Sequence, residues 1–186
     1  DNWERKFQFD QCAYPWQPPS PNMPDVETAL LYVGMCLFEG TNLSEGRGTP
    51  TPFKLIGAPW VKPQDVLSAI ETEALLGADV RIAMFKPESI PGKAANPRFQ
   101  DQTCKGLRIS VSDSQAIRPF TLAIAIIQAF RKVHPTQFRF IDFFDTLAGG
   151  NGLRQAIERG EQATTLARRF QAEHRAFDPK RILRYT

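Results

Sequence analysis

Apolar residues recur at helical spacing in several stretches of the chain. The first predicted helix has an apolar face between a capping residue and a glycine: the face is Val26, Ala29, Leu30 and Val33, the cap is Asn22 or Asp25, and Gly34 ends the helix. Residues 119–133 have an almost continuous apolar face, which predicts a buried helix. Further helices are predicted over 64–76, where Gly77 follows, and over 141–147, 153–159 and 161–176.

Short apolar runs and one alternating segment predict a small sheet. Runs at 35–38, 53–56 and 80–85 are of strand type, residues 107–112 alternate between apolar and polar, and residues 181–185 could add a terminal strand. Residues 86–105 have no periodicity, and loops of that length in compact domains are usually functional or mobile. Strands and helices do not alternate as a doubly wound sheet requires. The pattern therefore predicts an α+β fold, with a small mixed or antiparallel sheet packed with several helices.

The first part of the chain is rich in proline. Five of the 15 prolines lie between Pro15 and Pro24, which favours an extended path over a helix or a central strand. Tyr14 and Trp16 are unusual in a free linker and indicate that the segment packs on something. We therefore expect residues 1–24 to be a connecting segment packed on the domain, and residues 25–186 to form a single α+β domain.

Composition and charge narrow the range of partners. The net charge of +3 is too small for the basic field that nucleic-acid binders use, so a nucleic-acid partner is not expected. The longest uncharged run, 119–130, is shorter than the ~20 apolar residues that cross a bilayer, and no membrane span is predicted. The three cysteines and two histidines form no metal-binding pattern, and neither a metal nor a cofactor is predicted. The chain opens on Asp1 with no signal-peptide pattern, as expected of a piece of a longer protein.

The densest group of chemically active side chains lies in a predicted loop over residues 39–49. Together with Phe38 this segment holds three glycines, two carboxylates, one guanidinium, one amide and three hydroxyls. Glycines let the backbone approach a ligand, and an arginine offers a fork for a carboxylate or a phosphate. The composition predicts a polar ligand-binding loop. The lysine and the strand-to-helix context of a phosphate-binding loop are missing, which disfavours a nucleotide site.

A structural role for the same loop stays open. In that interpretation the segment is a turn in which Asn42 and Ser44 bond their own backbone, and Arg47 pairs internally with Glu39 or Glu45.

Several segments of the chain match the sequence pattern of a known family. The main segments are Tyr14-Pro15, Pro18 to Pro24, Cys36 to Asn42, Ser44 to Thr49, Pro52-Phe53 and Ile56 to Trp60, and weaker similarity continues through Cys104 to Gly106, Pro119, Asp142, Arg154, Ile157, Gly160 and Arg181 to Tyr185. On these residues the chain resembles the C-terminal domain of the exo-β-N-acetylmuramidases of the NamZ type, formerly a domain of unknown function. Val33 stands where the family often has Pro, and Phe140 lies near a position where it often has Trp.

The resemblance implies a function that this chain shares with a second domain. Members of the family cleave terminal β-linked N-acetylmuramic acid from peptidoglycan fragments, which implies a role in cell-wall recycling. They carry an upstream Rossmann-like domain, and the site is thought to lie in the cleft between the two. The resemblance therefore implies that residues 39–49 face that cleft, that this chain alone is inactive, and that the protein is periplasmic or extracellular.

The resemblance also implies roles for individual residues of the loop. Arg47 is expected to bind the lactyl carboxylate of the sugar, and Asn42 and Ser44 its hydroxyl or acetamido groups. Glu45 or Glu39 is expected to orient Arg47 or to supply one of the two carboxylates that glycoside hydrolysis uses.

Further residues complete the predicted site and its surroundings. Gly46, Gly48 and Thr49 are expected to line it through their backbone. Trp60 is expected either to stack on a sugar or to serve as a buried packing anchor, and the same alternatives hold for Trp16. Asp142 and Arg154 are expected to serve in helix capping and surface pairing, outside the chemistry.

Two other classes of function remain alternatives. One is a non-catalytic carbohydrate-binding or interaction module, which would bind sugar without an N-terminal partner. The other is a cytosolic anion-binding or regulatory domain, which would respond to phosphate or nucleotide rather than to muramic acid.

Overall fold

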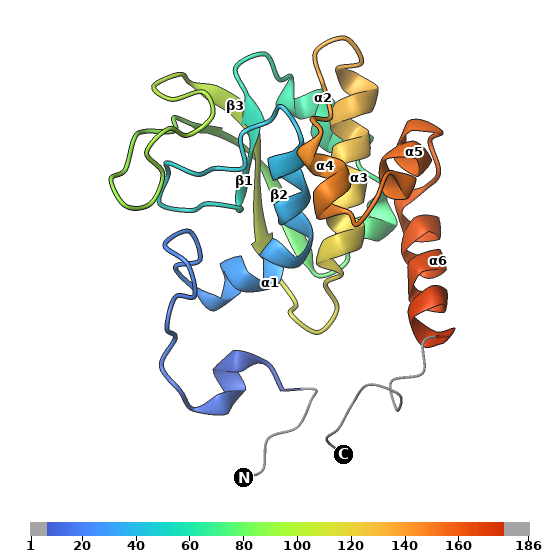
Figure 1. The fold of residues 1–186 in the computed structure, drawn as a ribbon, viewed down its shortest axis with the longest axis horizontal. Coiled ribbons are helices and arrows are strands. Elements are labelled where there is room, and N and C mark those ends of the chain that lie inside the picture. Colours follow the sequence, from blue (N-terminus) through green and yellow to red (C-terminus); the bar gives the residue numbers. More distant parts are fainter. Residues whose placement is uncertain (1–6, 177–186) are drawn as a thin grey trace.

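The computed structural model describes residues 7–176, and within this range it confirms an α+β domain. Three antiparallel strands form a sheet in the order β1-β3-β2, where β1 is Leu55–Ala58, β2 is Ala78–Phe85 and β3 is Cys104–Val111 (Figure 1). Leu107 of β3 lies opposite Ile56 on one side and Ile82 on the other. The predicted strands at 80–85 and 107–112 are confirmed with shifted ends, and the run at 53–56 becomes a strand that starts two residues later. The predicted strand at 181–185 lies outside the described residues.

Helical segments cover one face of the sheet. They are α1 (Val26–Met35), α2 (Pro63–Ala69), α3 (Pro119–Val133), α4 (Phe143–Leu147), α5 (Gly152–Glu158) and α6 (Ala163–Ala176), with 3-10 turns at Phe9–Cys12, Cys36–Gly40 and Thr72–Leu75. α1 and α2 contact both the sheet and α3, and α6 packs on α3 on the side away from the sheet (Figure 1). Eight residues of α3 are buried, so this helix forms the centre of the core, as its apolar pattern predicted.

The ends and the buried face of α1 differ in part from prediction. Asp25 is its N-cap and accepts a hydrogen bond from the backbone N–H of Thr28, as one of the two predicted caps. The prediction that Val33 belongs to the buried face is wrong, because Val33 is 61% exposed. Gly34 does not end the helix either. It is buried where α1 crosses α3, and a Cβ there would stand 2.1 Å from the carbonyl oxygen of Pro119.

Two further predictions are wrong, because an apolar run in the sequence does not show which tertiary neighbours its residues will contact. Residues 35–38 are not a strand, since they complete α1 and begin the 3-10 turn Cys36–Gly40, which packs against α4. The helix predicted over 64–76 is divided into α2 and the turn Thr72–Leu75, because the backbone of Ile70 and Glu71 is extended.

The long connection between β2 and β3 packs on part of the second face of the sheet. Leu55, Phe85 and Cys104 form a small buried cluster there, and Phe99 from this connection packs against it. At Phe99, therefore, the connection is packed against the domain and is not a free loop.

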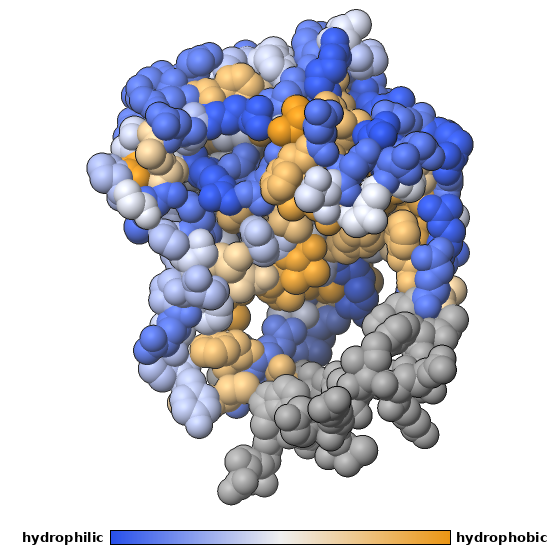
Figure 2. Space-filling model, in the orientation of Figure 1, coloured by the Kyte–Doolittle hydropathy of each residue, from blue (hydrophilic) through white to orange (hydrophobic). Residues whose placement is uncertain are grey.

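The N-terminal proline-rich segment also makes specific contacts. The indole N–H of Trp16 donates to the carbonyl of Met23 at 3.1 Å, and the side-chain amide of Asn22 donates to the carbonyl of Lys93 at 2.9 Å. In Figure 2 the surface is hydrophilic over most of its upper part, and apolar side chains reach it in a band over α1 and α4. None of the helices described is both long and apolar enough to pass through a bilayer.

Candidate functional site

The beginning of the polar loop is clamped to the chain that precedes α4. The backbone N–H of Asn42 donates to the carbonyl of Arg139 at 3.0 Å, and its side-chain oxygen accepts from the Arg139 N–H at 2.8 Å. The Asn42 amide nitrogen also donates to the carbonyl of Gln137 at 2.8 Å, and the Ile141 N–H donates to the carbonyl of Gly40 at 2.9 Å. The Asn42 side chain is therefore engaged in holding two main-chain segments together.

The middle of the loop is joined to β1 and to itself. Ser44 and Gly57 exchange backbone hydrogen bonds of 2.8 and 3.0 Å. The Ser44 hydroxyl accepts from the N–H of Gly46 at 3.2 Å, and the Thr49 hydroxyl donates to the carbonyl of Gly46 at 2.6 Å. These short-range bonds have the pattern of the structural turn considered above, so both hydroxyls help to set the backbone of the loop.

Gly48 is the point at which the β2–β3 connection touches the loop. Its φ is +80°, and a Cβ at this position would stand 2.5 Å from the carbonyl oxygen of Glu88 and 2.7 Å from Pro97. The N–H of Glu88 donates to the Gly48 carbonyl at 2.8 Å. Glycine is required here both for the left-handed backbone and for the close approach.

Arg47 bridges the two glutamates of the loop. Its Nε forms an ion pair of 3.2 Å with Glu45, and a terminal nitrogen donates a hydrogen bond to Glu39. Its guanidinium carbon lies 5.2 Å from the centre of the Phe53 ring, within the range of a cation–π interaction. The internal pairing that the sequence left open is thus present, and both glutamates take part in it.

Glu45 is the buried carboxylate of the cluster. Its side chain is 9% exposed, compared with 16% for Glu39 and 34% for Arg47. Burial raises the pKa of Glu45, and the charge of Glu39 adds to this, whereas the positive charges of Arg47 and Arg98 oppose it. Compared with an exposed glutamate, the environment shifts Glu45 toward its acid form, which is the direction in which a general acid is tuned.

Three residues join this cluster that were not among the predicted site residues. Phe53 has a φ of +61° and donates its backbone N–H to the carbonyl of Glu45 at 2.7 Å, and the Tyr32 ring meets the Phe53 ring edge-on at 4.7 Å. Burial and the charge of Glu39 raise the pKa of Tyr32. Arg98 enters from the β2–β3 connection, a segment that the sequence had marked only as long and aperiodic. Phe53 is within the matched Pro52-Phe53 motif, which was the available signal for it.

Trp60 lies apart from this cluster, packed against the core. Its ring meets that of His134 edge-on at 5.2 Å, and the His134 ring nitrogen accepts from the N–H of Lys62 at 3.1 Å. This environment corresponds to the packing-anchor alternative for Trp60.

Comparisons with known proteins identify the family to which the chain belongs. The sequence pattern of the family described as "Exo-beta-N-acetylmuramidase NamZ, C-terminal" matches residues 30–185. The chain belongs to this family. The polar loop and all of the cluster residues named above lie within the matched range.

One curated relative and two solved structures extend this result. The chain is 33% identical over 182 residues to the peptidoglycan beta-N-acetylmuramidase NamZ of Bacillus subtilis, a match that covers 97% of this chain and 42% of the relative. A DUF1343 family protein from Bacteroides fragilis shares the fold with a TM-score of 0.73 at 19% identity, over 87% of this chain and 42% of its own. A second one from the same organism has a TM-score of 0.59 at 30% identity, over 84% and 39%. The chain thus spans less than half the length of each of these three proteins.

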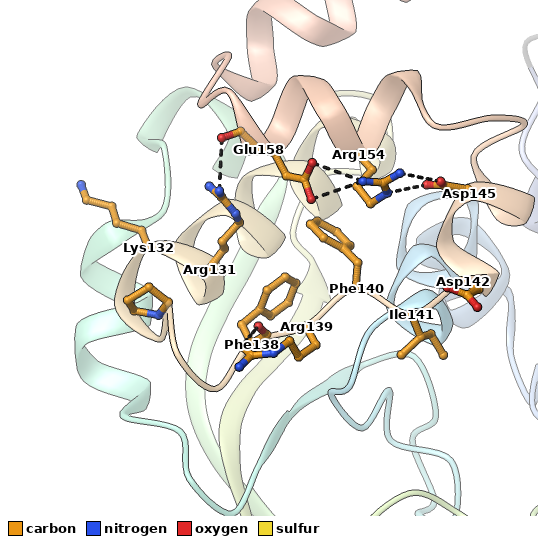
Figure 3. A pocket seen from close by; sticks show the side chains of 11 residues that line it. Arg131, Lys132, Phe138, Arg139, Phe140, Ile141, Asp142, Asp145, Arg154 and Glu158 are labelled. Atoms are coloured by element: carbon orange, nitrogen blue, oxygen red, sulfur yellow. Dashed lines mark hydrogen bonds and ion pairs between the residues drawn. The ribbon is translucent and has the colours of Figure 1, made fainter.

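A separate pocket of about 570 Å³ lies among α3, α4 and α5 (Figure 3). Arg154 at its edge forms a two-pronged pair with Asp145, both N–O distances being 2.9 Å, and a longer contact of 3.3 Å with Glu158. The expected surface pairing of Arg154 is confirmed. Asp142 occupies the N-cap position of α4, but its side chain makes no capping bond there. None of the eleven residues that line this pocket belongs to the polar loop.

Proposed function

We propose that this chain is the C-terminal, substrate-binding portion of an exo-β-N-acetylmuramidase, which removes terminal β-linked N-acetylmuramic acid from peptidoglycan fragments. The polar loop then forms one wall of a cleft shared with an N-terminal catalytic domain. The observation that carries the proposal is the joint pairing of Arg47 with Glu39 and Glu45, on a loop that lies within the family match. The name of the Bacillus subtilis relative, a peptidoglycan beta-N-acetylmuramidase, supports the substrate class.

The environments of the two glutamates suit different tasks. Glycoside hydrolysis commonly needs one carboxylic acid that protonates the leaving oxygen and one carboxylate that acts on the opposite side of the sugar. Glu45 is proposed as the acid, because burial raises its pKa and favours its protonated form. Glu39 orients Arg47, which in turn holds Glu45 in place, and the second catalytic carboxylate is assigned to the N-terminal domain. Because peptidoglycan lies outside the cytoplasm, this substrate also fits a protein that is periplasmic or extracellular and acts in cell-wall recycling.

Hydrolysis of p-nitrophenyl β-N-acetylmuraminide tests this proposal. The chain is assayed alone and joined to the preceding part of the Bacillus subtilis relative, with that relative itself as the positive reference. We expect activity in the joined protein only, and its loss in the Glu45→Gln variant but not in Glu73→Gln, a change at an exposed glutamate on a 3-10 turn. A joined protein that folds, binds muramic acid and releases no p-nitrophenol would support the non-catalytic carbohydrate-binding module instead.

A further inference from the structure

The β2–β3 connection delivers a second arginine to the polar loop. Pro97 lies directly against Gly48, and Glu88 is hydrogen-bonded to the same residue. Arg98 follows Pro97, and its positive charge acts on the carboxyl of Glu45. The β2–β3 connection therefore contacts the polar loop at Gly48 and adds a second positive charge to the surroundings of Glu45.

The two arginines differ in how their nitrogens are used. Arg47 is engaged by Glu39 and Glu45. Arg98 is partly buried, and its Nε is buried without a hydrogen-bond partner, while no carboxylate lies within ion-pair distance of its guanidinium among residues 7–176. A buried donor without a partner is costly, and native structures keep such groups mainly where a ligand or a water completes them.

The backbone around Arg98 is held in an unfavourable conformation. Four residues other than glycine in the described chain have a positive φ, and two of them are Phe99, which follows Arg98, and Asp101, three residues after Arg98. The Phe99 side chain is anchored under the sheet, and the Asp101 N–H donates to the carbonyl of Pro87 at 2.8 Å. Strained backbone that the surrounding structure maintains in this way is concentrated at functional sites. These contacts fix the position of Arg98 before any ligand arrives.

We propose that Arg98, rather than Arg47, is the residue of this site that recognises the carboxylate of an acidic sugar. The proposal rests on the function proposed above, which supplies the lactyl carboxylate of N-acetylmuramic acid as the anion. A substrate carboxylate at Arg47 would compete with Glu39 and Glu45, which already pair with its terminal nitrogen and its Nε. At Arg98 it meets a planar guanidinium with unused donors, a geometry that matches a carboxylate.

Carboxylate binding at Arg98 would also act on Glu45. The bound anion neutralises one of the positive charges that lower the pKa of Glu45, so that the protonated form of Glu45 is favoured further when the acidic sugar is present. Recognition of the substrate and preparation of the proton donor are thereby coupled through Arg98.

The side-chain N–H signals of the arginines in an NMR titration of this chain provide the first test. N-acetylmuramic acid is expected to shift the Nε–H signal of Arg98, which is assigned by its loss in Arg98→Lys, whereas its methyl ester and N-acetylglucosamine should leave that signal in place. A shift confined to Arg47, or an equal shift with inorganic phosphate, would overturn the carboxylate assignment. If Arg98→Lys folds poorly, through-bond correlation with the Arg98 backbone assigns the Nε–H signal in the wild type.

The second test measures discrimination between acid and ester in the joined protein. Arg98→Gln is expected to lower kcat/KM for the muraminide roughly tenfold or more relative to kcat/KM for its methyl ester, the loss of one charge-assisted contact, so that the preference for the acid disappears. Arg81→Gln, at an exposed arginine of β2, is the matched control and should preserve the preference. If hydrolysis persists and Arg98→Gln keeps the wild-type preference, this inference is wrong while the proposed function stands. If the joined protein is inactive, the proposed function fails, and the Arg98 signal in the titration alone decides the inference.

Discussion

The Nε of Arg47 lies 3.2 Å from a carboxylate oxygen of Glu45, whose side chain is only 9% exposed. The same guanidinium also binds Glu39, so a single positive charge is shared by two carboxyl groups, one of which is largely removed from water. This arrangement makes Arg47 important for the stability of the loop as well as for its chemistry, and it separates the role of Arg47 from that of Arg98.

The Arg47→Ala variant should be unstable, because it leaves the buried carboxyl of Glu45 without its partner. We expect the free energy of unfolding to fall by about 1–3 kcal/mol, the usual cost of an orphaned buried polar group. Chemical denaturation measures this quantity. The double variant Arg47→Ala/Glu45→Gln should recover part of the loss, because the pair is coupled, and Arg81→Ala should change stability by less than about 0.5 kcal/mol. Strict additivity of the two single changes would contradict the coupling.

The contribution of Glu45 to stability should depend on pH in a defined direction. Burial raises its pKa above the ordinary value of 4.5 in the folded chain, so the folded chain binds this proton more tightly than the unfolded chain does. The resulting stability is fully present below the ordinary pKa and is lost as the pH rises through the raised pKa. The stability of the wild type relative to Glu45→Gln should therefore fall as the pH rises from below the ordinary pKa of 4.5 through the raised pKa.

The matched control for this titration is Glu73→Gln, at an exposed glutamate. Its difference from the wild type should vary little with pH by comparison. A pH-independent difference for Glu45→Gln would show that the folded chain does not hold the Glu45 proton more tightly.

A pair of glycine substitutions isolates the contact between the loop and the β2–β3 connection. Gly48 and Gly92 have similar φ values, +80° and +76°, but a Cβ at Gly48 would strike Glu88 and Pro97, whereas a Cβ at Gly92 would meet nothing within 4 Å. Gly92→Ala should cost about 1–2 kcal/mol, the price of a left-handed alanine. Gly48→Ala should cost more, and it should also reduce hydrolysis by the joined protein, because it displaces Arg98. Equal thermal stability of the two variants would contradict the close approach at Gly48.

The apolar pattern of the sequence correctly predicted the helix that has apolar neighbours on nearly every side. α3 begins at Pro119 and ends at Val133 as predicted, because it is surrounded by apolar neighbours and its pattern records only burial. The pattern misled at α1, where the buried positions include Thr28 and Gly34 and the exposed ones include Val33. At this position α1 packs so closely on α3 that a side chain at Gly34 would not fit. This close packing, rather than hydropathy, decided which residues of α1 are buried.

In the polar loop, too, some features followed from the sequence and others were decided only by the tertiary structure. Its glycines, glutamates and arginine are adjacent in the sequence, so their residue types alone predicted that they would act together and left open whether Arg47 would pair inside the loop. Local chain geometry also set the Ser44 and Thr49 turns, which span only a few residues.

Contacts between distant segments were decided only by the tertiary structure. The clamp between Asn42 and Arg139, the approach of Pro97 to Gly48 and the position of Arg98 beside Glu45 each join segments that have no common periodicity or motif. The burial that raises the pKa of Glu45 is likewise a property of the assembled packing. The sequence by itself thus determined which groups the loop carries and the family to which the chain belongs. Packing across the sheet and the long connection decided which arginine is engaged, which has unused donors, and which carboxyl is held out of water.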